Sequence, residues 1–286
     1  MKQAMFMGLI CGVLTTGVYG GEDDGIFSLK VGKIEVYMLV EGQRDGNAGI
    51  LVGIDETALR KYIPETGLKH STNAFLVKTP SQIILIDTGT GSGGVILDKV
   101  IKLGVQPEKV DAILITHLHG DHFGTMQKDG KAIFPNAKVY LSAKEREYFT
   151  KTALNQGAVN ALAAYGANVI TFEPAELGMK LNEILPGISP AAAYGHTPGH
   201  TVYLIEDGNA KFIVAGDLLH VAPVQFPLPG ISASYDTDKD TAGVTRKQVL
   251  EYAAKNNIPL GGMHIVYPGV GDVRAAGAGF TFTPLK

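Results

Sequence analysis

The fold is decided by one stretch, Thr116-His117-Leu118-His119-Gly120-Asp121-His122. It places three imidazoles and a carboxylate within six positions, in a chain that has only eight histidines. Imidazole nitrogens and carboxylate oxygens are the ligands that zinc and similar ions accept at about 2.0–2.2 Å. A polar loop with scattered histidines would seldom reach this density. The stretch therefore predicts a metal site.

The residues before this stretch predict how it is held. Ala112-Ile113-Leu114-Ile115 is a continuous apolar run, which is typical of a strand buried on both faces. Such a strand delivers the chain directly into the histidines. The metal ligands are thus expected at the end of a central strand.

Three later clusters present the same kinds of side chain in similar strand-to-loop settings. They are Gly195-His196-Thr197-Pro198-Gly199-His200, Val214-Ala215-Gly216-Asp217 and Gly262-Met263-His264. A lone histidine such as His264 is more often a packed core residue than a ligand. In combination with the other clusters, a role as ligand is the better interpretation.

Strand-like and helix-like segments follow one another along the rest of the chain. Gly32-Lys33 separates two β-rich runs, 26–31 and 34–39, and predicts a hairpin. Further strands are predicted at 74–78, 82–86, 138–141, 201–205 and 211–214, and helices at 95–103, 143–149, 159–165 and 244–256. Residues 41–73 carry glycines and charges, and we predict an insertion near the mouth of the site. No repeat or linker divides the chain, which predicts one large domain.

The first twenty residues differ in composition from the rest. Lys2 precedes a short apolar stretch that ends in small residues up to Gly20. This order is typical of a secretory signal peptide, and the apolar part is shorter than the roughly 20 residues of a spanning helix. We expect a signal peptide at 1–20 and a secreted or periplasmic domain at 21–286. The single cysteine, Cys11, lies in the expected signal peptide, so the mature chain would offer no thiolate ligand.

Composition and charge narrow the range of partners. With 45% hydrophobic and 19% charged residues, the 286-residue chain is ordinary for a globular protein. Its formal net charge of -3 gives no electrostatic reason to bind nucleic acid or an anionic membrane. We expect a small-molecule substrate, no nucleic-acid partner and no membrane association in the mature form. The oligomeric state stays open, with a homodimer as one option.

Taken together, the four clusters resemble the metallo-β-lactamase superfamily, from about the first hairpin to the end of the chain. The resemblance implies an α/β (α+β) fold, a four-layer αββα sandwich with two divalent metal ions, expected to be zinc, at one edge between the sheets. It assigns one ion to His117, His119 and His196, the other to Asp121, His122 and His264, and a bridging position to Asp217. Asp87 matches an early aspartate that orients ligands in the superfamily, although by itself it indicates only a turn.

Within the superfamily, residues 216–226 and the tail at 267–271 resemble the methyl parathion hydrolase branch, which is close to the N-acyl homoserine lactonases. The lactonases usually carry tyrosine three positions after the bridging aspartate, where this chain has His220. The pocket of the methyl parathion enzyme contains tryptophan, and this chain has none. Neither substrate preference therefore transfers directly.

The resemblance implies a hydrolase in which a metal-bridging hydroxide attacks an ester, lactone or phosphotriester. Asp121 is a candidate for accepting the proton of the nucleophile, and His220 for contacting the substrate or an oxyanion. His200 is expected to support a loop through a hydrogen bond. His70 has no motif around it and is interpreted as structural or exposed.

Two alternatives stay open at this point. A β-lactamase-like amide hydrolase would suit a secreted protein, but zinc β-lactamases lack the bridging aspartate. A non-hydrolytic di-iron redox protein on the same fold usually has an acidic residue among the early ligands, whereas His119 is intact here. Metal analysis combined with an assay of ester hydrolysis would separate these classes.

Overall fold

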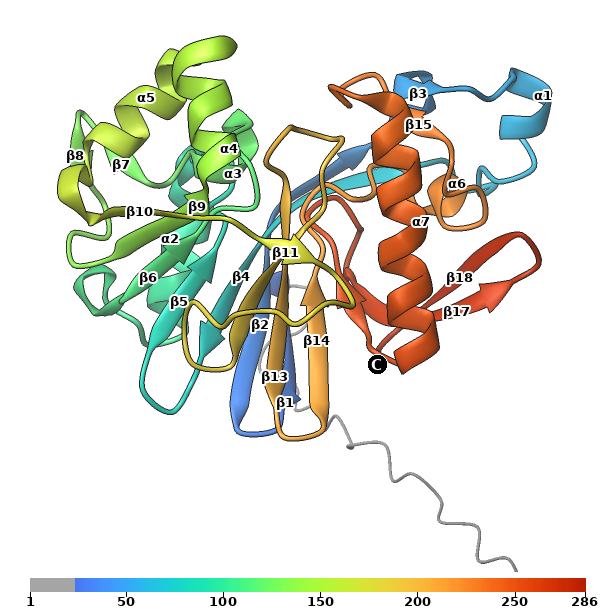
Figure 1. Ribbon diagram of the computed structural model, residues 1–286. Helices are drawn as coiled ribbons and strands as arrows, with labels where there is room; N and C mark the ends of the chain where they lie inside the picture. The colour runs from blue at the N-terminus through green and yellow to red at the C-terminus, as the bar shows by residue number, and fades with distance from the viewer. Residues whose placement is uncertain (1–23) are drawn as a thin grey trace, which may run out of the picture.

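The computed structural model describes residues 24–286, which form two large sheets that face each other with helices outside (Figure 1). The predicted signal peptide at 1–20 lies outside the described residues. In spatial order the first sheet contains β1 (Ile26–Val31), β2 (Ile34–Asp45), β4 (Lys69–Lys78), β5 (Ile83–Ile86), β6 (Ala112–Leu114), β9 (Lys138–Ser142) and β10 (Val169–Phe172). The second contains β11 (Ala175–Glu176), β12 (Ile188–Ala192), β13 (Thr201–Asp207), β14 (Ala210–Val214), β16 (Leu260–Gly261), β17 (Val270–Ala276) and β18 (Gly279–Pro284).

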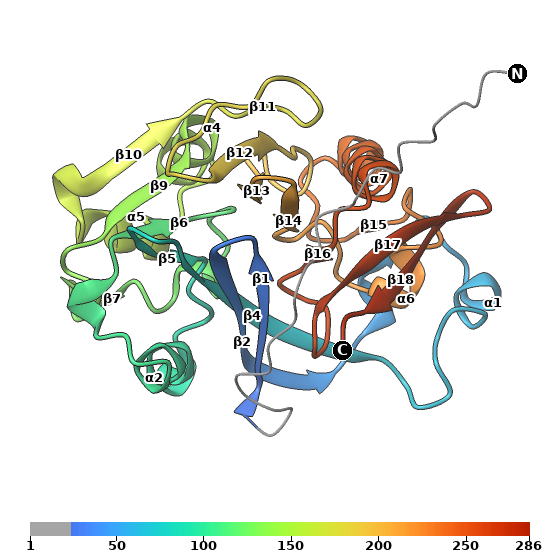
Figure 2. The same cartoon turned by 90° about the horizontal axis from the view of Figure 1, so that it is seen from below.

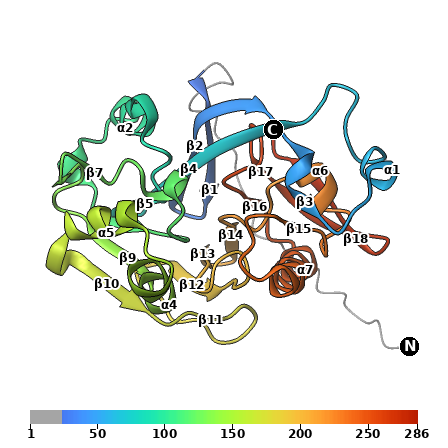
Figure 3. The same ribbon diagram turned by 90° about the horizontal axis from the view of Figure 1, so that it is seen from above.

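The described residues contain seven α-helices. They are α1 (Glu56–Leu59), α2 (Val95–Lys102), α3 (Gly120–Phe123), α4 (Ala143–Glu147), α5 (Gln156–Ala163), α6 (Ala222–Gln225) and α7 (Lys239–Asn256). Viewed from above, α2 and α5 lie outside the first sheet and α7 lies outside the second (Figure 3). Viewed from below, the β1–β2 hairpin lies beside β13 and β14, which places the two sheets face to face (Figure 2).

Three hydrophobic clusters in the described part of the chain fill the space between these layers. One joins the first sheet to α2 and α5, one lies between the sheets, and one joins the second sheet to α7. The middle cluster includes Val36 and Phe75 from the first sheet and Phe212 and Val214 from the second, all fully buried. Burial of apolar surface on both faces of each sheet is the main favourable contribution to this arrangement. The predicted αββα sandwich is confirmed.

The parallel part of the first sheet positions the metal motif. Strands β5, β6 and β9 run parallel, so their carboxyl ends meet at one edge. The apolar strand predicted from 112 is β6, and its three residues are fully buried or nearly so. Asp87 follows β5 and Thr116 begins the histidine segment two residues after β6. The edge of the sheet thus brings these segments together.

Two elements, α7 and β4, begin five residues earlier than the sequence pattern predicts. Helix α7 begins at Lys239 instead of 244, because the Asp238 side chain accepts a hydrogen bond from the Thr241 backbone at 3.0 Å and caps the helix. Strand β4 begins at Lys69 instead of 74, because β2 continues past an irregularity after Val40 and pairs with it. The first five residues of β4, 69–73, are all polar, so the sequence shows no alternation of apolar side chains that would predict a strand there.

The insertion predicted from 41–73 reaches the second half of the molecule. Its short strand β3 (Leu51–Val52) pairs with β15 (Ser232–Ala233), and Figure 3 shows β3 and α1 beside α6 and β15. A separate small hairpin joins β7 (Gln127–Lys128) to β8 (Lys131–Ala132). Within residues 24–286, none of the helices has the length and hydropathy needed to cross a bilayer.

Candidate metal centre

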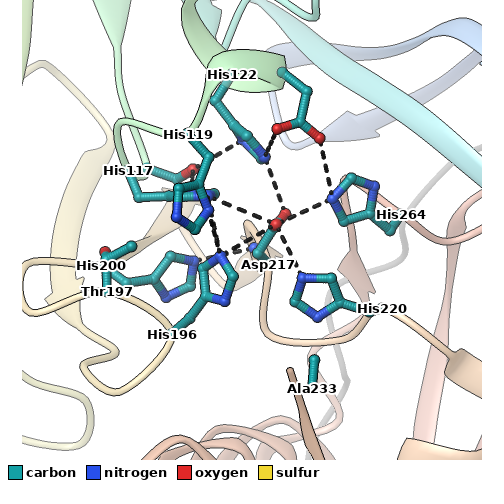
Figure 4. Close-up of polar contacts among 12 residues, drawn as sticks. His117, His119, His122, His196, Thr197, His200, Asp217, His220, Ala233 and His264 are labelled. Atoms are coloured by element: carbon teal, nitrogen blue, oxygen red, sulfur yellow. Dashed lines mark hydrogen bonds and ion pairs between the residues drawn. The ribbon is translucent and has the colours of Figure 1, made fainter. Parts of the chain in front are cut away.

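Segments from both sheets bring all seven predicted ligands into one cluster (Figure 4). The segment after β6 supplies His117, His119, Asp121 and His122, the loop after β12 supplies His196, and the turns after β14 and β16 supply Asp217 and His264. Ligands on strand ends are held by the sheets themselves, which gives the precision that a metal site requires.

Three imidazole nitrogens converge in the first predicted ligand set. His117 Nε2 lies 3.1 Å from His119 Nδ1, and His196 Nε2 lies 3.1 Å from the former and 3.0 Å from the latter. A tetrahedral ion with bonds of about 2.0–2.1 Å would hold its ligands roughly 3.3 Å apart. Three converging nitrogens therefore fit one face of such an ion.

Asp217 lies between the two ligand sets. Its Oδ2 is 3.3 Å from His196 Nε2 and 3.0 Å from His264 Nε2, while its Oδ1 is 3.2 Å from His122 Nε2. The second set is completed by Asp121, whose carboxylate oxygens lie 3.7 Å from His122 Nε2 and 3.5 Å from His264 Nε2. One carboxylate thus faces both sets, as the predicted bridging position requires.

The environment of His122 supports a cation at its Nε2. Its Nδ1 lies 2.7 Å from Asp87 Oδ2, so this nitrogen donates to the carboxylate. The buried Nε2 and the facing Asp217 Oδ1 make no hydrogen bond. When Nδ1 carries the proton of a neutral ring, the two facing atoms both present lone pairs. A cation between them relieves that repulsion, and the donor set therefore fits a metal ion.

Asp87 does more than form a turn. It accepts hydrogen bonds from Thr116 N at 2.8 Å and Thr116 Oγ1 at 2.6 Å, in addition to holding His122. Its φ of 56° lies in the left-handed region, which aspartate tolerates better than most residues. Asp87 therefore fixes both the start of the histidine segment and the orientation of a ligand ring.

The other ligand rings are oriented in the same way. His196 Nδ1 lies 2.9 Å from Asp236 Oδ1, and Asp236 in turn contacts the buried Arg246 at 3.4 Å. His264 Nδ1 donates to Ser71 O at 2.9 Å. Each contact leaves Nε2 free to face the centre. Asp236 and Arg246 carry no motif and were missed by the sequence analysis.

Glu145, on α4, joins the two loops of the first ligand set and was also missed. It is fully buried and accepts hydrogen bonds from Leu118 N at 2.8 Å, Thr197 Oγ1 at 2.7 Å and Gly199 N at 2.9 Å. A Cβ at Gly199 would lie 2.2 Å from the Glu145 backbone nitrogen, so this position needs glycine. Only the contact between the two distant segments identifies Glu145.

Electrostatics favours the neutral imidazole that a metal ligand needs at His117 and His119, and the charged carboxylate at Asp217. Burial lowers the pKa of His117 well below its usual value and that of His119 to about 4. Burial opposes the charge of Asp217, but the His122 and His264 rings hold its pKa well below the usual range. Burial likewise opposes protonation of His122, yet the carboxylates around it raise its pKa well above 6.5. The same carboxylates attract a metal ion.

The remaining histidines have distinct places. His200 donates from Nδ1 to Ala193 O at 2.8 Å and accepts from Asp217 N at 3.0 Å, so the predicted loop support is confirmed. His220 is buried; its Nε2 lies 3.2 Å from Asp217 Oδ2, and its Nδ1 has no hydrogen-bond partner. Burial lowers the pKa of His220 to about 4.

His70, interpreted from the sequence as structural or exposed, lines the pocket beside the ligands. Its ring stacks on that of His264, with centroids 4.4 Å apart and planes 24° apart. Burial, aided by the His264 and Arg44 charges, lowers the pKa of His70 to about 4. No sequence motif marks this residue, because it reaches the site only through the early start of β4.

A pocket of about 380 Å³ opens above the cluster. Its floor consists of ligands and His220, and its walls come from residues 44–50 and His70 on one side and Tyr235 on the other. The prediction that the insertion lies near the mouth of the site is confirmed. Tyr235 is 55% exposed at the rim, whereas Phe123 and Phe226 belong to the hydrophobic core.

Comparison with known proteins agrees with this geometry. Residues 68–257 match the family model described as the metallo-beta-lactamase superfamily. The chain belongs to this superfamily. Its fold and its cluster of metal-binding side chains are those of a metal-dependent hydrolase. A curated relative, the uncharacterized protein YobT of Bacillus subtilis (strain 168), is 31% identical over 155 residues, which cover 51% of this chain and 60% of YobT.

Two solved structures of this superfamily fold resemble the chain over most of its length. The hydrolase AbOPH, described as a member of the beta-lactamase superfamily, is 31% identical with a TM-score of 0.82. AidC, described as a dizinc quorum-quenching lactonase in complex with the product N-hexnoyl-L-homoserine, is 28% identical with a TM-score of 0.82. Each alignment covers 92% of this chain and 98% of the other.

Proposed function

We propose that this protein is a dinuclear metal-dependent hydrolase that acts on an ester, lactone or phosphotriester group of a small molecule. The observation that carries the proposal is the position of Asp217. Its carboxylate lies between the two ligand sets, with Oδ2 3.3 Å from His196 Nε2 and 3.0 Å from His264 Nε2, and Oδ1 3.2 Å from His122 Nε2. A single-ion site would not need a buried carboxylate shared between two groups of ligands.

Two divalent ions, when bound, lower the pKa of a shared water and stabilise charge that develops on a carbonyl or phosphoryl oxygen. The chain supplies the rest of the site. His117, His119 and His196 would hold one ion, Asp121, His122 and His264 the other, and Asp217 both. The contacts of Asp87, Asp236 and Ser71 keep the ligand rings oriented, which avoids rearrangement during the reaction.

Two residues are proposed to act on the reacting groups. The Asp121 side chain is 34% exposed and lines the pocket, while the bridging Asp217 is buried, so Asp121 is the carboxylate that can exchange a proton with substrate or solvent. His220 lines the pocket, and its Nε2 lies 3.2 Å from Asp217 Oδ2. We propose that it donates a hydrogen bond to the substrate oxygen as that oxygen gains charge.

The small-molecule substrate class is supported by the relatives and by the size of the pocket. The pocket volume of about 380 Å³ suits a drug-sized molecule and not a folded partner. AidC is described with a product of lactone hydrolysis bound. Zinc is the proposed ion, because three imidazoles in a compact, closed set suit it well.

The test is a panel of aryl esters, lactones, phosphotriesters and β-lactams, offered to the purified mature protein with its metal content measured on the same preparation. We expect two ions per chain, hydrolysis of at least one ester-like class, and loss of activity on chelation that returns with metal. A fully active protein with a single ion would contradict the dinuclear proposal. Iron in place of zinc, without hydrolysis, would favour a redox protein.

We also propose that the protein is exported and that its mature chain begins near Gly21. The proposal rests on the charged start and the short apolar stretch of residues 1–20. Mass spectrometry of the protein recovered from separated cell fractions tests it. An intact Met1 in the cytosolic fraction would refute it.

A further inference from the structure

One wall of the pocket carries two side chains that the proposed chemistry does not use. Arg44 lies on β2 beyond the irregularity after Val40, and its register partner on β4 is His70. Both line the pocket above the metal ligands. Strands β2 and β4 thus continue past the edge of the sandwich, and they place the Arg44 guanidinium and the His70 imidazole beside the metal ligands.

Neither side chain has a hydrogen-bond or ion-pair partner within the described residues. Among residues 24–286, the Arg44 guanidinium has no carboxylate within ion-pair distance, and the His70 ring makes no hydrogen bond. The neighbouring Asp45 does not neutralise Arg44, since its carboxylate lies 2.6 Å from Lys69 Nζ. A guanidinium offers five N–H donors, and a neutral imidazole always offers one. Arg44 and His70 thus present hydrogen-bond donors that no acceptor of the described residues occupies.

The rest of the pocket offers no further carboxylate that could pair with Arg44 or His70. Its other carboxylates, Asp121 and Asp217, are the proposed metal ligands, and two divalent ions outweigh their two charges. A substrate that reaches the centre would therefore meet net positive charge on the floor and a free guanidinium on the wall. Arginine binds carboxylate and phosphate groups through paired N–H donors, which adds geometric selection to charge.

We propose that Arg44 and His70 form an anion subsite that binds a carboxylate or phosphate group carried by the substrate, apart from the bond that is cleaved. The inference rests on the proposed function, and it narrows the substrate class to ester-like molecules that carry a separate oxyacid group. The stacking of His70 on His264, at 4.4 Å between centroids, fixes the subsite relative to the ligands. The subsite would therefore set the distance between the anionic group and the reacting bond.

Matched substrates test the subsite. An aryl ester of succinic acid with a free carboxylate is compared with its methyl-capped, neutral counterpart, and a third ester carries a phosphonate in place of the carboxylate. We expect the wild-type protein to have a higher kcat/KM for the charged esters than for the neutral one. Arg44→Gln should lower kcat/KM for the charged esters at least about tenfold and leave the neutral ester within about twofold.

Two further variants separate the subsite from general effects. Arg60→Gln removes an arginine of the same insertion that is exposed and paired with Glu56, and it should change nothing. His70→Phe keeps an aromatic ring against His264 and removes the N–H donor, so it should reduce the preference for charged esters while both ions remain. The carboxylate and phosphonate arms show which oxyacid the subsite prefers.

A binding measurement keeps the inference independent of turnover. Calorimetry with the corresponding non-hydrolysable amides, on metal-loaded wild-type and Arg44→Gln protein, should show tighter binding of the charged amide only in the wild type. If the wild type binds the charged and neutral amides equally, or if Arg44→Gln weakens both equally, the subsite is refuted. If no ester is hydrolysed but the charged amide still depends on Arg44, the proposed function fails and the subsite stands.

Discussion

The floor and the rim of the pocket are built in different ways. The floor consists of ligands on short turns after buried strands, and almost every ring has a second contact, such as His122 with Asp87 at 2.7 Å. The rim comes from residues 44–50 and from Tyr235, which is 55% exposed. Side chains of the floor are held in place by many contacts, whereas side chains of the rim are held by few.

This difference separates chemistry from substrate choice. A buried ligand whose second ring nitrogen is held by a hydrogen bond cannot change without loss of the centre. A rim side chain with few partners can change at small cost in stability, because surface substitutions usually stay within about 0.5 kcal/mol. We therefore expect substitutions on the floor to affect metal and rate, and those on the rim to affect the substrate.

The largest effect is expected at Asp217. Asp217→Ala removes the carboxylate that faces both ligand sets and leaves two cations poorly neutralised at close range. Metal content and activity should be lost together, by more than the 10–100-fold drop that typically follows loss of a supporting contact. Elemental analysis and kcat/KM on the same preparation provide the measurement. Asp98→Ala, at an exposed position on α2, is the control.

A smaller loss is expected at His220, three residues away. His220→Ala should keep both ions and lower kcat/KM on the order of 10²-fold, the usual cost of one positioned donor. Its Nε2 lies 3.2 Å from Asp217 Oδ2, so the alternative is that it binds metal. Loss of an ion in this variant would make His220 a ligand, and an unchanged rate would make it structural.

Glu145 provides a test of the floor that involves no ligand. Glu145→Gln keeps one acceptor oxygen but turns an amide N–H₂ toward groups that themselves donate, at Leu118 or at Thr197 and Gly199. The affinity of the His117, His119 and His196 set should fall about tenfold, and that of the other set should stay. A stepwise cobalt titration followed by absorption distinguishes the two sites.

The matched control for this experiment lies on the same helix. Glu147→Gln removes an exposed carboxylate that pairs with Lys151 at 3.6 Å and should leave both affinities unchanged. Equal weakening of the two sites in Glu145→Gln would indicate a general loss of structure, and the proposed positioning role would then be wrong.

The floor could be predicted from the sequence because its information is local. His117, His119, Asp121 and His122 lie within six positions, and a continuous apolar run precedes them. Each later ligand also sits in a short strand-to-loop segment. The resemblance of these segments to one superfamily then supplied the sandwich and the pairing of distant ligands.

The rest could not be predicted, because it depends on contacts between distant segments. Glu145 and Asp236 are ordinary acidic residues in sequence, and only folding brings them to the ligand loops. His70 enters the pocket because β4 begins at Lys69, where the polar sequence gives no strand pattern. Pairing of β3 with β15 across the molecule is likewise invisible to periodicity.

The smallest effect is expected on the rim, at Tyr235. Its ring lies 5.8 Å from that of His220 and lines the pocket, yet it is 55% exposed. Tyr235→Ala should raise KM about two- to tenfold, the value of one aromatic contact of roughly 0.5–1.5 kcal/mol, and leave kcat unchanged. Metal content and the midpoint of thermal unfolding should match the wild type. A fall in kcat or in metal content would mean that Tyr235 acts on the floor through His220, and the separation of floor from rim would then fail at this residue.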